Sequence, residues 1–136
     1  MILNINDNQF IIDLQERFSE CFPYLKIEFY DKPCACGKQA QDHELLPGNL
    51  RLSDCRRIHD PGLLDIKSYY KTGRVELDFK EIFGLHVQIF RREANRWAAT
   101  CKTKNLTLQQ QSEIAQARLR VAPKRELVEV GDYGYH

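Results

Sequence analysis

The chain has 136 residues, of which 43% are hydrophobic and 29% charged, and its formal net charge is +1. These values are typical of one soluble globular domain, and they exclude a disordered, collagen-like or disulfide-framework protein. No apolar run is long enough to cross a bilayer, and the N-terminus does not have the pattern of a secretory signal. We therefore expect a cytoplasmic protein with reduced cysteines.

The first predicted elements form a β-α-β unit. After the short strand-like segment ILNI, apolar residues recur every four positions and predict an amphipathic helix. Its apolar residues are Phe10, Leu14, Phe18 and Phe22. Asn6 is the expected N-cap, with Gln9 as its capping-box partner. Pro23 ends the helix, and the alternation from Leu25 to Tyr30 predicts a strand with one buried face.

The same order of elements returns about sixty residues later. The segment LDIKSYY predicts a strand, Thr72-Gly73 a turn, and a second apolar repeat a helix that Gly84 ends. Its apolar residues are Val75, Phe79 and Phe83, and the segment GLHVQIFRR then alternates as a strand. Two such units side by side predict a two-layer α+β sandwich with a ferredoxin-like plan, in which one antiparallel sheet carries both helices on one face.

The rest of the chain extends this repeated core. The segment RWAATCK predicts a further strand at 96–102, and a third helix follows with Thr107 as N-cap and Gln110 as its capping-box partner. That helix has few apolar residues, so we expect it to lie on the surface or against a partner. The predicted domain spans 1–122, with a long loop at 31–62, and 123–136 form a tail that is flexible or adds an edge strand.

The amino-acid sequences of the two strand segments also resemble those of other proteins. FPYLKIEFY, and GLHVQIFRR followed by a Trp, resemble a group of small soluble bacterial proteins with no assigned function. This resemblance covers most of the chain outside the cysteine-bearing loop. It implies no activity, cofactor or site residue.

The loop at 31–62 is the segment that core packing explains least, and it contains three of the five cysteines. Zinc commonly takes four Cys or His ligands, often as a close pair followed by a second pair. Cys34, Cys36, Cys55 and His59 would supply such a set. The C-x-C spacing is one residue shorter than the usual knuckle, so incidental cysteines in a solvated loop are the alternative.

The same loop offers a second chemistry. If Ser53 caps a short helix, Cys55 lies near its N-terminus, where unpaired N–H groups favour a thiolate. His59 and Asp60 would then complete a nucleophile and base pair. No oxyanion-hole or phosphate-loop motif accompanies them, so we assign no catalytic residue.

Basic residues concentrate between positions 88 and 125, which carry nine Lys or Arg and two Glu. Five of them lie at the ends of the predicted hairpin: Arg91, Arg92, Arg96, Lys102 and Lys104. With Trp97 beside them, they are candidates for contact with nucleic acid or another anion. Ordinary surface charge is the alternative, because the aromatic pattern of RNA-binding ferredoxin-like sheets is missing.

The sequence as a whole favours a non-enzymatic interaction or regulatory module. A homodimer would cover the open sheet edges, and another protein is the alternative partner. No membrane partner and no cofactor other than zinc is expected. The competing hypotheses are a zinc-stabilised domain that uses the 34–59 loop and a nucleic-acid-binding protein that uses the basic 91–104 hairpin.

Overall fold

The computed structural model describes the side chains of residues 1–33 and 44–120 and continues the backbone to residue 129. Its elements are β1 (Ile2–Ile5), α1 (Ile11–Cys21), β2 (Leu25–Tyr30), the 3₁₀ helix η2 (Leu52–Asp54), β3 (Gly62–Asp65), α2 (Thr72–Phe83), β4 (His86–Glu93), β5 (Arg96–Ala99) and α3 (Leu108–Glu129). The mixed α+β class predicted from the sequence is confirmed. In the described part of the chain, no helix is both long and apolar enough to span a membrane.

The strands form two antiparallel sheets rather than the single sheet expected from the sequence. β1 pairs with β3, and β4 lies between β2 and β5 in the second sheet. The expected single sheet is therefore wrong, and the ferredoxin-like plan is not confirmed. The physical reason is that period-two alternation fixes which side chains of a strand are buried, but not which strand lies beside it.

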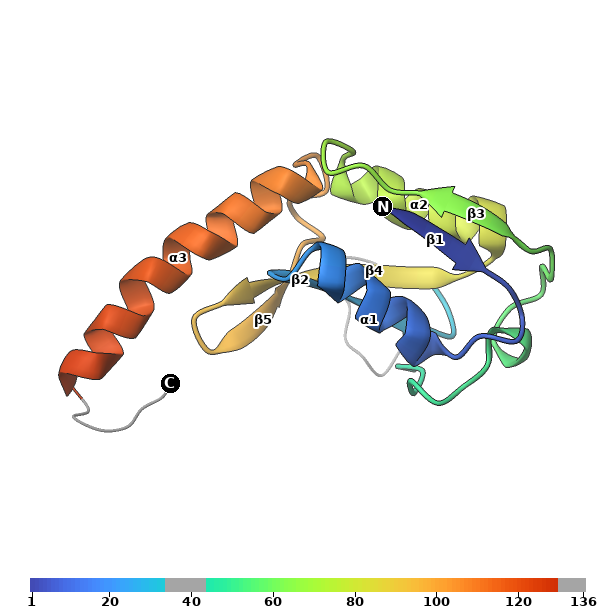
Figure 1. The fold of residues 1–136 in the computed structure, drawn as a ribbon, viewed down its shortest axis with the longest axis horizontal. Coiled ribbons are helices and arrows are strands. Elements are labelled where there is room, and N and C mark those ends of the chain that lie inside the picture. The colour runs from blue at the N-terminus through green and yellow to red at the C-terminus, as the bar shows by residue number, and fades with distance from the viewer. Residues whose placement is uncertain (34–43, 130–136) are drawn as a thin grey trace.

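One hydrophobic core joins the two sheets. Its buried side chains come from β1 to β4 and from all three described α-helices, and they include Leu3, Phe18, Phe29, Leu64, Phe79, Ile89 and Leu108. α1 packs against β2, and α2 and α3 pack against β4. The rings of Phe29 and Phe79 meet edge to face with their centroids 6.0 Å apart. Figure 1 shows α1, α2 and both sheets gathered at one end of the molecule, with α3 leading away from them.

Two of the predicted helix boundaries are confirmed. Gly84 follows α2 with a φ of 66°, a left-handed conformation that glycine adopts without steric cost. At the start of α3, the Thr107 N–H donates to Gln110 Oε1 at 2.9 Å, and the Gln110 N–H donates to Thr107 Oγ1 at 3.1 Å. This is the capping box that the sequence predicts.

Two other boundaries differ from the prediction. The Asn6 N–H does donate to Gln9 Oε1, but this pair closes a turn and α1 begins only at Ile11. Phe10 is the N-cap, and its N–H donates to Asp13 Oδ2 at 2.9 Å. Thr72 and Gly73 form the first turn of α2 rather than a turn before it. In both places the same short polar motif is compatible with a turn and with the start of a helix, so the motif alone does not fix the boundary.

The third helix is longer than expected. α3 has 22 residues and continues through Glu129, past residue 123 where the tail was expected to begin. At 1.5 Å per residue it is roughly 33 Å long. Only its first part lies against the sheets, and the rest extends beyond them (Figure 1).

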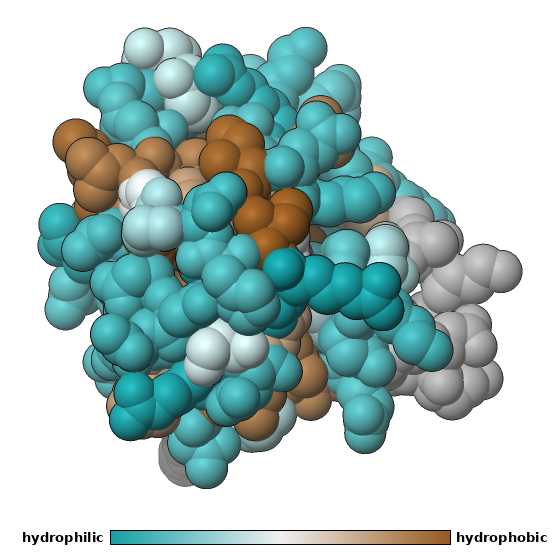
Figure 2. All heavy atoms as spheres, turned by 90° about the vertical axis from the view of Figure 1, so that its right-hand side faces the viewer, coloured by the Kyte–Doolittle hydropathy of each residue, from teal (hydrophilic) through white to brown (hydrophobic). Residues whose placement is uncertain are grey.

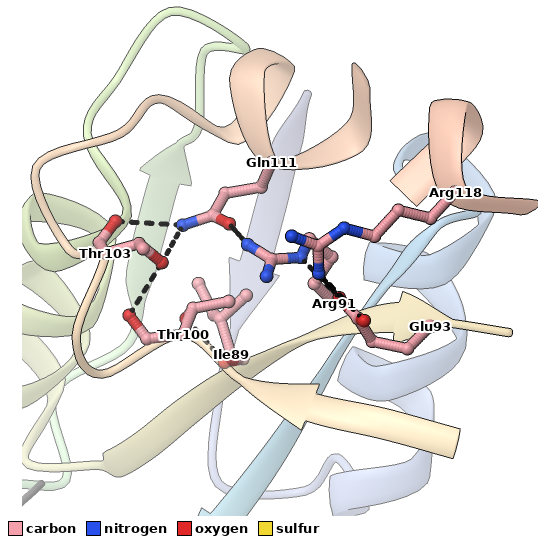
Figure 3. A network of polar contacts seen from close by, with 7 residues as sticks. All are labelled: Ile89, Arg91, Glu93, Thr100, Thr103, Gln111 and Arg118. Atoms are coloured by element: carbon pink, nitrogen blue, oxygen red, sulfur yellow. Dashed lines mark hydrogen bonds and ion pairs between the residues drawn. The ribbon is translucent and has the colours of Figure 1, made fainter. Parts of the chain in front are cut away.

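A buried glutamine anchors α3. Gln111 is fully buried, and its Oε1 accepts a hydrogen bond of 2.6 Å from Arg91 Nη1 of β4. Its Nε2 donates to the carbonyl oxygen and Oγ1 of Thr103, at 2.9 and 3.0 Å (Figure 3). The same nitrogen also donates to Thr72 Oγ1 at 3.2 Å. The amide therefore ties α3 to β4, to the segment before α3 and to the start of α2.

A carboxylate extends this network along α3. Glu93 accepts a hydrogen bond from Arg91 Nε at 3.1 Å and one from Arg118 Nη1 at 2.6 Å (Figure 3). Burial alone would raise the pKa of Glu93, but the hydrogen bonds from the two arginines outweigh it and lower the pKa. Glu93 therefore stays ionised at neutral pH and fixes a second point of α3, two turns after Gln111.

We predict that Gln111→Leu destabilises the fold by about 2 to 4 kcal/mol, because it leaves the buried Arg91 guanidinium without its amide acceptor. Gln109→Leu is the matched control, because Gln109 is an exposed neighbour whose side chain donates a hydrogen bond to the exposed Glu113. It should change stability by less than about 0.5 kcal/mol. Urea unfolding measures both variants, and equal midpoints would contradict the anchoring role of Gln111.

Candidate functional site

The structure describes two of the four residues of the predicted zinc set, Cys55 and His59. Cys34 and Cys36 lie outside the described residues. Cys55 is half-buried, and its thiol donates to the carbonyl oxygens of Arg51 and Leu52, each at 3.6 Å. Within residues 1–33 and 44–120, no three His, Cys, Asp or Glu side chains gather in a way that could hold a metal ion. The zinc site therefore stays a prediction.

The predicted activation of Cys55 by a helix N-terminus is wrong. η2 has only three residues, with Arg51 as its N-cap and Cys55 as its C-cap, so Ser53 does not precede the helix. Burial raises the pKa of the Cys55 thiol, which therefore keeps its proton at neutral pH. His59 pairs with Asp7 on the β1–α1 connection. Sequence spacing missed this partner because Asp7 lies 52 positions away.

Cys21 and Cys55 are free thiols in the described structure.

A buried ion pair holds the segment after η2 against the β1–α1 connection. The Arg56 side chain is fully buried, and its Nε lies 2.9 Å from Asp7 Oδ1. Its Nη1 donates to the carbonyl oxygen of Phe83 at 3.2 Å, and its Nη2 is buried without a hydrogen-bond partner in the described structure. The other carboxylate oxygen of Asp7 lies 2.7 Å from His59 Nδ1. Burial alone would raise the pKa of Asp7, but hydrogen bonds from Arg56 and His59 lower it.

A cavity of about 710 Å³ lies beside this ion pair. Its lining comes from the end of β2, from the segment after η2 and from the turn between α2 and β4. Polar members include Lys32, Arg56, Arg57 and His86, and apolar members include Leu46 and Ile58. Gly84 also belongs to the lining, and an added Cβ there would lie 3.4 Å from Ile58. The volume is that of a typical small-molecule site.

Hydrophobic side chains are also exposed on the surface of this part of the molecule. Ile58, Leu63 and Ile82 are 38%, 69% and 53% exposed, so they are not core residues. Figure 2 shows hydrophobic side chains gathered on one face and surrounded by hydrophilic ones.

The five predicted basic residues do not form one patch. Arg91 is buried and bonded to Glu93 and Gln111, so it is not available to an external anion, which corrects the prediction for that residue. Lys104 is exposed but lies 3.3 Å from the buried Glu76 carboxylate. Arg92, Arg96 and Lys102 are exposed. The strand parity of Arg91 matches that of the buried Ile89, so this alternation could have predicted its burial.

One face of the second sheet does combine aromatic and basic side chains. Lys26 lies opposite Phe90 in the β2–β4 ladder, and Arg92 lies opposite Trp97 in the β4–β5 ladder. Lys26 Nζ is 5.1 Å from the Trp97 ring centroid and 5.5 Å from that of Phe90, and the Arg92 guanidinium is 5.8 Å from that of Trp97. We call Lys26, Phe90, Arg92 and Trp97 the aromatic face.

No family model, no curated protein and no solved structure matches this chain. Its function therefore has to be argued from its own residues.

We predict that Asp7→Asn destabilises the fold by about 2 to 3 kcal/mol, because it removes the carboxylate that compensates the buried Arg56 guanidinium. The cost is at the low end for a buried pair because Asp7 itself is partly exposed. His59→Ala, which removes the exposed partner of the same carboxylate, should cost less than about 1 kcal/mol. Thermal or urea unfolding of both variants measures the difference.

The pH dependence of the free energy of unfolding supplies the control for this prediction. Because the folded-state pKa of Asp7 is lowered, its stabilisation is complete above its unfolded pKa of about 3.9 and is lost as the pH falls through the lower folded value. The difference in the free energy of unfolding between wild type and Asp7→Asn should therefore disappear in that acidic range. A difference that stays constant down to the lowest pH at which both proteins fold would contradict the role of the carboxylate.

Proposed function

We propose that this protein is a non-enzymatic interaction module that self-associates through α3. The observation that carries the proposal is the extension of α3 beyond its anchored part. Leu108, Gln111 and Ala115 are its fully buried side chains among the residues described to 120, and Glu93 holds it at Arg118. The helix then continues for eleven residues, about three turns, to Glu129.

A helical segment of this length needs a packing partner to be stable. Isolated helices shorter than about 12–15 residues are marginal in water, and most helical stability comes from burying one face. Figure 1 shows the C-terminal part of α3 away from both sheets. A second copy of the chain would supply the missing contact surface.

The exposed side of α3 offers an apolar surface for that copy. A shallow groove of about 360 Å³ is lined by Leu106, Gln110, Glu113, Ile114 and Ala117. The four helical positions have the spacing of one helix face, and this face differs from the one that carries Leu108, Gln111 and Ala115.

Two copies of α3 that run antiparallel can bring this groove of one copy against the same groove of the other. A closed two-fold pair of this kind uses the same surface on both copies.

We predict that the wild-type chain has the mass of two copies in solution and that Ile114→Arg reduces it to one, because the new charge lies in the apolar groove. Ile82→Arg is the matched control, since Ile82 is an exposed isoleucine at 53% on another helix, and it should leave the mass unchanged. Light scattering coupled to size exclusion measures all three. A one-copy mass for the wild type would contradict the proposal, and so would a two-copy mass for Ile114→Arg.

A second candidate function is the binding of single-stranded nucleic acid, and the aromatic face favours it. Bases stack on partly exposed aromatic rings, while neighbouring cations contact phosphates. Trp97 and Phe90 are partly exposed, Arg92 is exposed, and Lys26 lies over both rings. The Lys26 ion pair with Glu28 at 3.1 Å reduces the positive charge available there, so we place this function second.

Trp97 is the single tryptophan of the chain, so its fluorescence reports on this face directly. If nucleic acid binds there, a short oligothymidine should quench the fluorescence, and binding should weaken steeply with salt and severalfold in Arg92→Ala. Arg74→Ala is the matched control, because Arg74 also stacks on an aromatic ring, at 3.7 Å from the Tyr70 centroid. No quenching at low salt would exclude this function.

We also propose that the two β-α-β units are copies related by an approximate two-fold axis. The strand register supports this. Leu3 lies opposite Leu64, 61 positions away, and Glu28 lies opposite Gln88, 60 positions away. These separations are the offsets at which the apolar residues of the two units align in the sequence. A cytoplasmic location is proposed from the sequence alone.

A further inference from the structure

We propose that the cavity beside Arg56 binds a small molecule that carries a carboxylate or phosphate group next to an apolar portion. This site is separate from α3 and from the aromatic face, so it does not depend on either proposed function. The cavity of about 710 Å³ lies between the end of β2, the segment after η2 and the turn that leads into β4.

Arg56 provides the first reason for an oxyanion. It is 6% exposed, and two of its three guanidinium nitrogens are bonded, Nε to Asp7 and Nη1 to the Phe83 carbonyl oxygen. Nη2 is buried and has no hydrogen-bond partner in the described structure. A buried N–H group without an acceptor is costly, and a guanidinium pairs best with the paired oxygens of a carboxylate or phosphate. A ligand seated against Arg56 would supply the acceptor that the chain does not.

His86 is the second group of this kind. It lines the same cavity, and its Nδ1 is also buried without a hydrogen-bond partner in the described structure. Burial lowers the pKa of His86, with the nearby Lys80 acting in the same direction, so the ring is neutral at pH 7 and has one N–H to donate. The two unpartnered nitrogens therefore belong to residues from separate elements that line the same cavity.

The charged groups at the rim favour an anion over a cation. Lys32 and Arg57 are exposed and line the cavity, and neither forms an ion pair with another residue that the structure describes. Of the two carboxylates in the lining, Asp31 already accepts a hydrogen bond of 2.6 Å from the Glu44 N–H. Asp54 is exposed and is the remaining acidic group.

The remaining lining residues indicate what the uncharged portion of the ligand is like. Pro33, Leu46 and Ile58 contribute apolar surface beside the cationic groups. Sites for small molecules typically combine such surface with a few polar groups that orient the ligand. The cavity therefore suits an amphiphilic anion, and a small anion without an apolar portion should occupy its cationic part alone.

Acetate and inorganic phosphate are the probes that test this, each titrated into ¹⁵N-labelled full-length protein at constant ionic strength. We expect saturable shifts of the Arg56, Arg57 and His86 amides with one of the two, and the more effective probe identifies the ligand class. Arg57→Ala should weaken binding severalfold. Arg17→Ala, which removes an exposed arginine of α1 that pairs with Glu20, should not.

A second variant addresses the buried donor. Arg56→Lys keeps the charge but removes the guanidinium, and it should weaken binding by about tenfold, the loss expected for one charge-assisted hydrogen bond. If Arg56→Lys does not fold, His86→Phe tests the other unpartnered nitrogen in the same way. The proposal is overturned if neither probe gives a saturable shift at these amides, if chloride gives the same shifts, or if Arg57→Ala binds as well as wild type.

Discussion

The hydrogen bond of 2.6 Å between Arg91 and Gln111 is the contact on which the placement of α3 depends. Arg91 belongs to the central strand of the second sheet, and Gln111 is in the first turn of α3. Because both side chains are buried, neither can exchange its partner for water without a large cost. The helix therefore leaves the core in one fixed direction, and that direction carries its C-terminal part away from the sheets.

The same arrangement occurs twice in the molecule. In each case a buried arginine pairs with a carboxylate that a second, more exposed side chain also contacts. Glu93 joins Arg91 to Arg118, and Asp7 joins Arg56 to His59. The hydrogen bond from the exposed side chain helps to keep the carboxylate ionised, and the carboxylate compensates the buried guanidinium. The two differ in that Arg56 retains a nitrogen without a partner, and it is this arginine that lines the cavity.

The features that the sequence predicts well are local ones. The Thr107 capping box, the left-handed Gly84 and the β4–β5 hairpin each depend on residues a few positions apart. The spacing of apolar residues along each element also predicts which of its faces is buried. Phe18 and Phe79 are core residues, as this spacing predicts. Nothing local distinguishes one sheet from two, because strand neighbours are chosen by packing over the whole chain.

The features that the sequence hides are pairs of polar residues far apart in the chain. Gln111 stands in a run of three glutamines, and its contacts with Arg91 and Thr72, 20 and 39 positions away, distinguish it from its exposed neighbours. Asp7 and Arg56 are 49 positions apart, and each alone resembles an ordinary surface charge. Arg91 was grouped with exposed arginines for the same reason. The cavity likewise collects residues from separate segments of the chain, which no motif records.

The central claim is that a second copy of the chain orders the C-terminal part of α3, and hydrogen exchange at two protein concentrations tests it most directly. The account predicts that backbone amides from 119 to 129 become more protected as the concentration rises, while those of β2 and β4 do not change. Equally fast exchange of the 119–129 amides at both concentrations would contradict it.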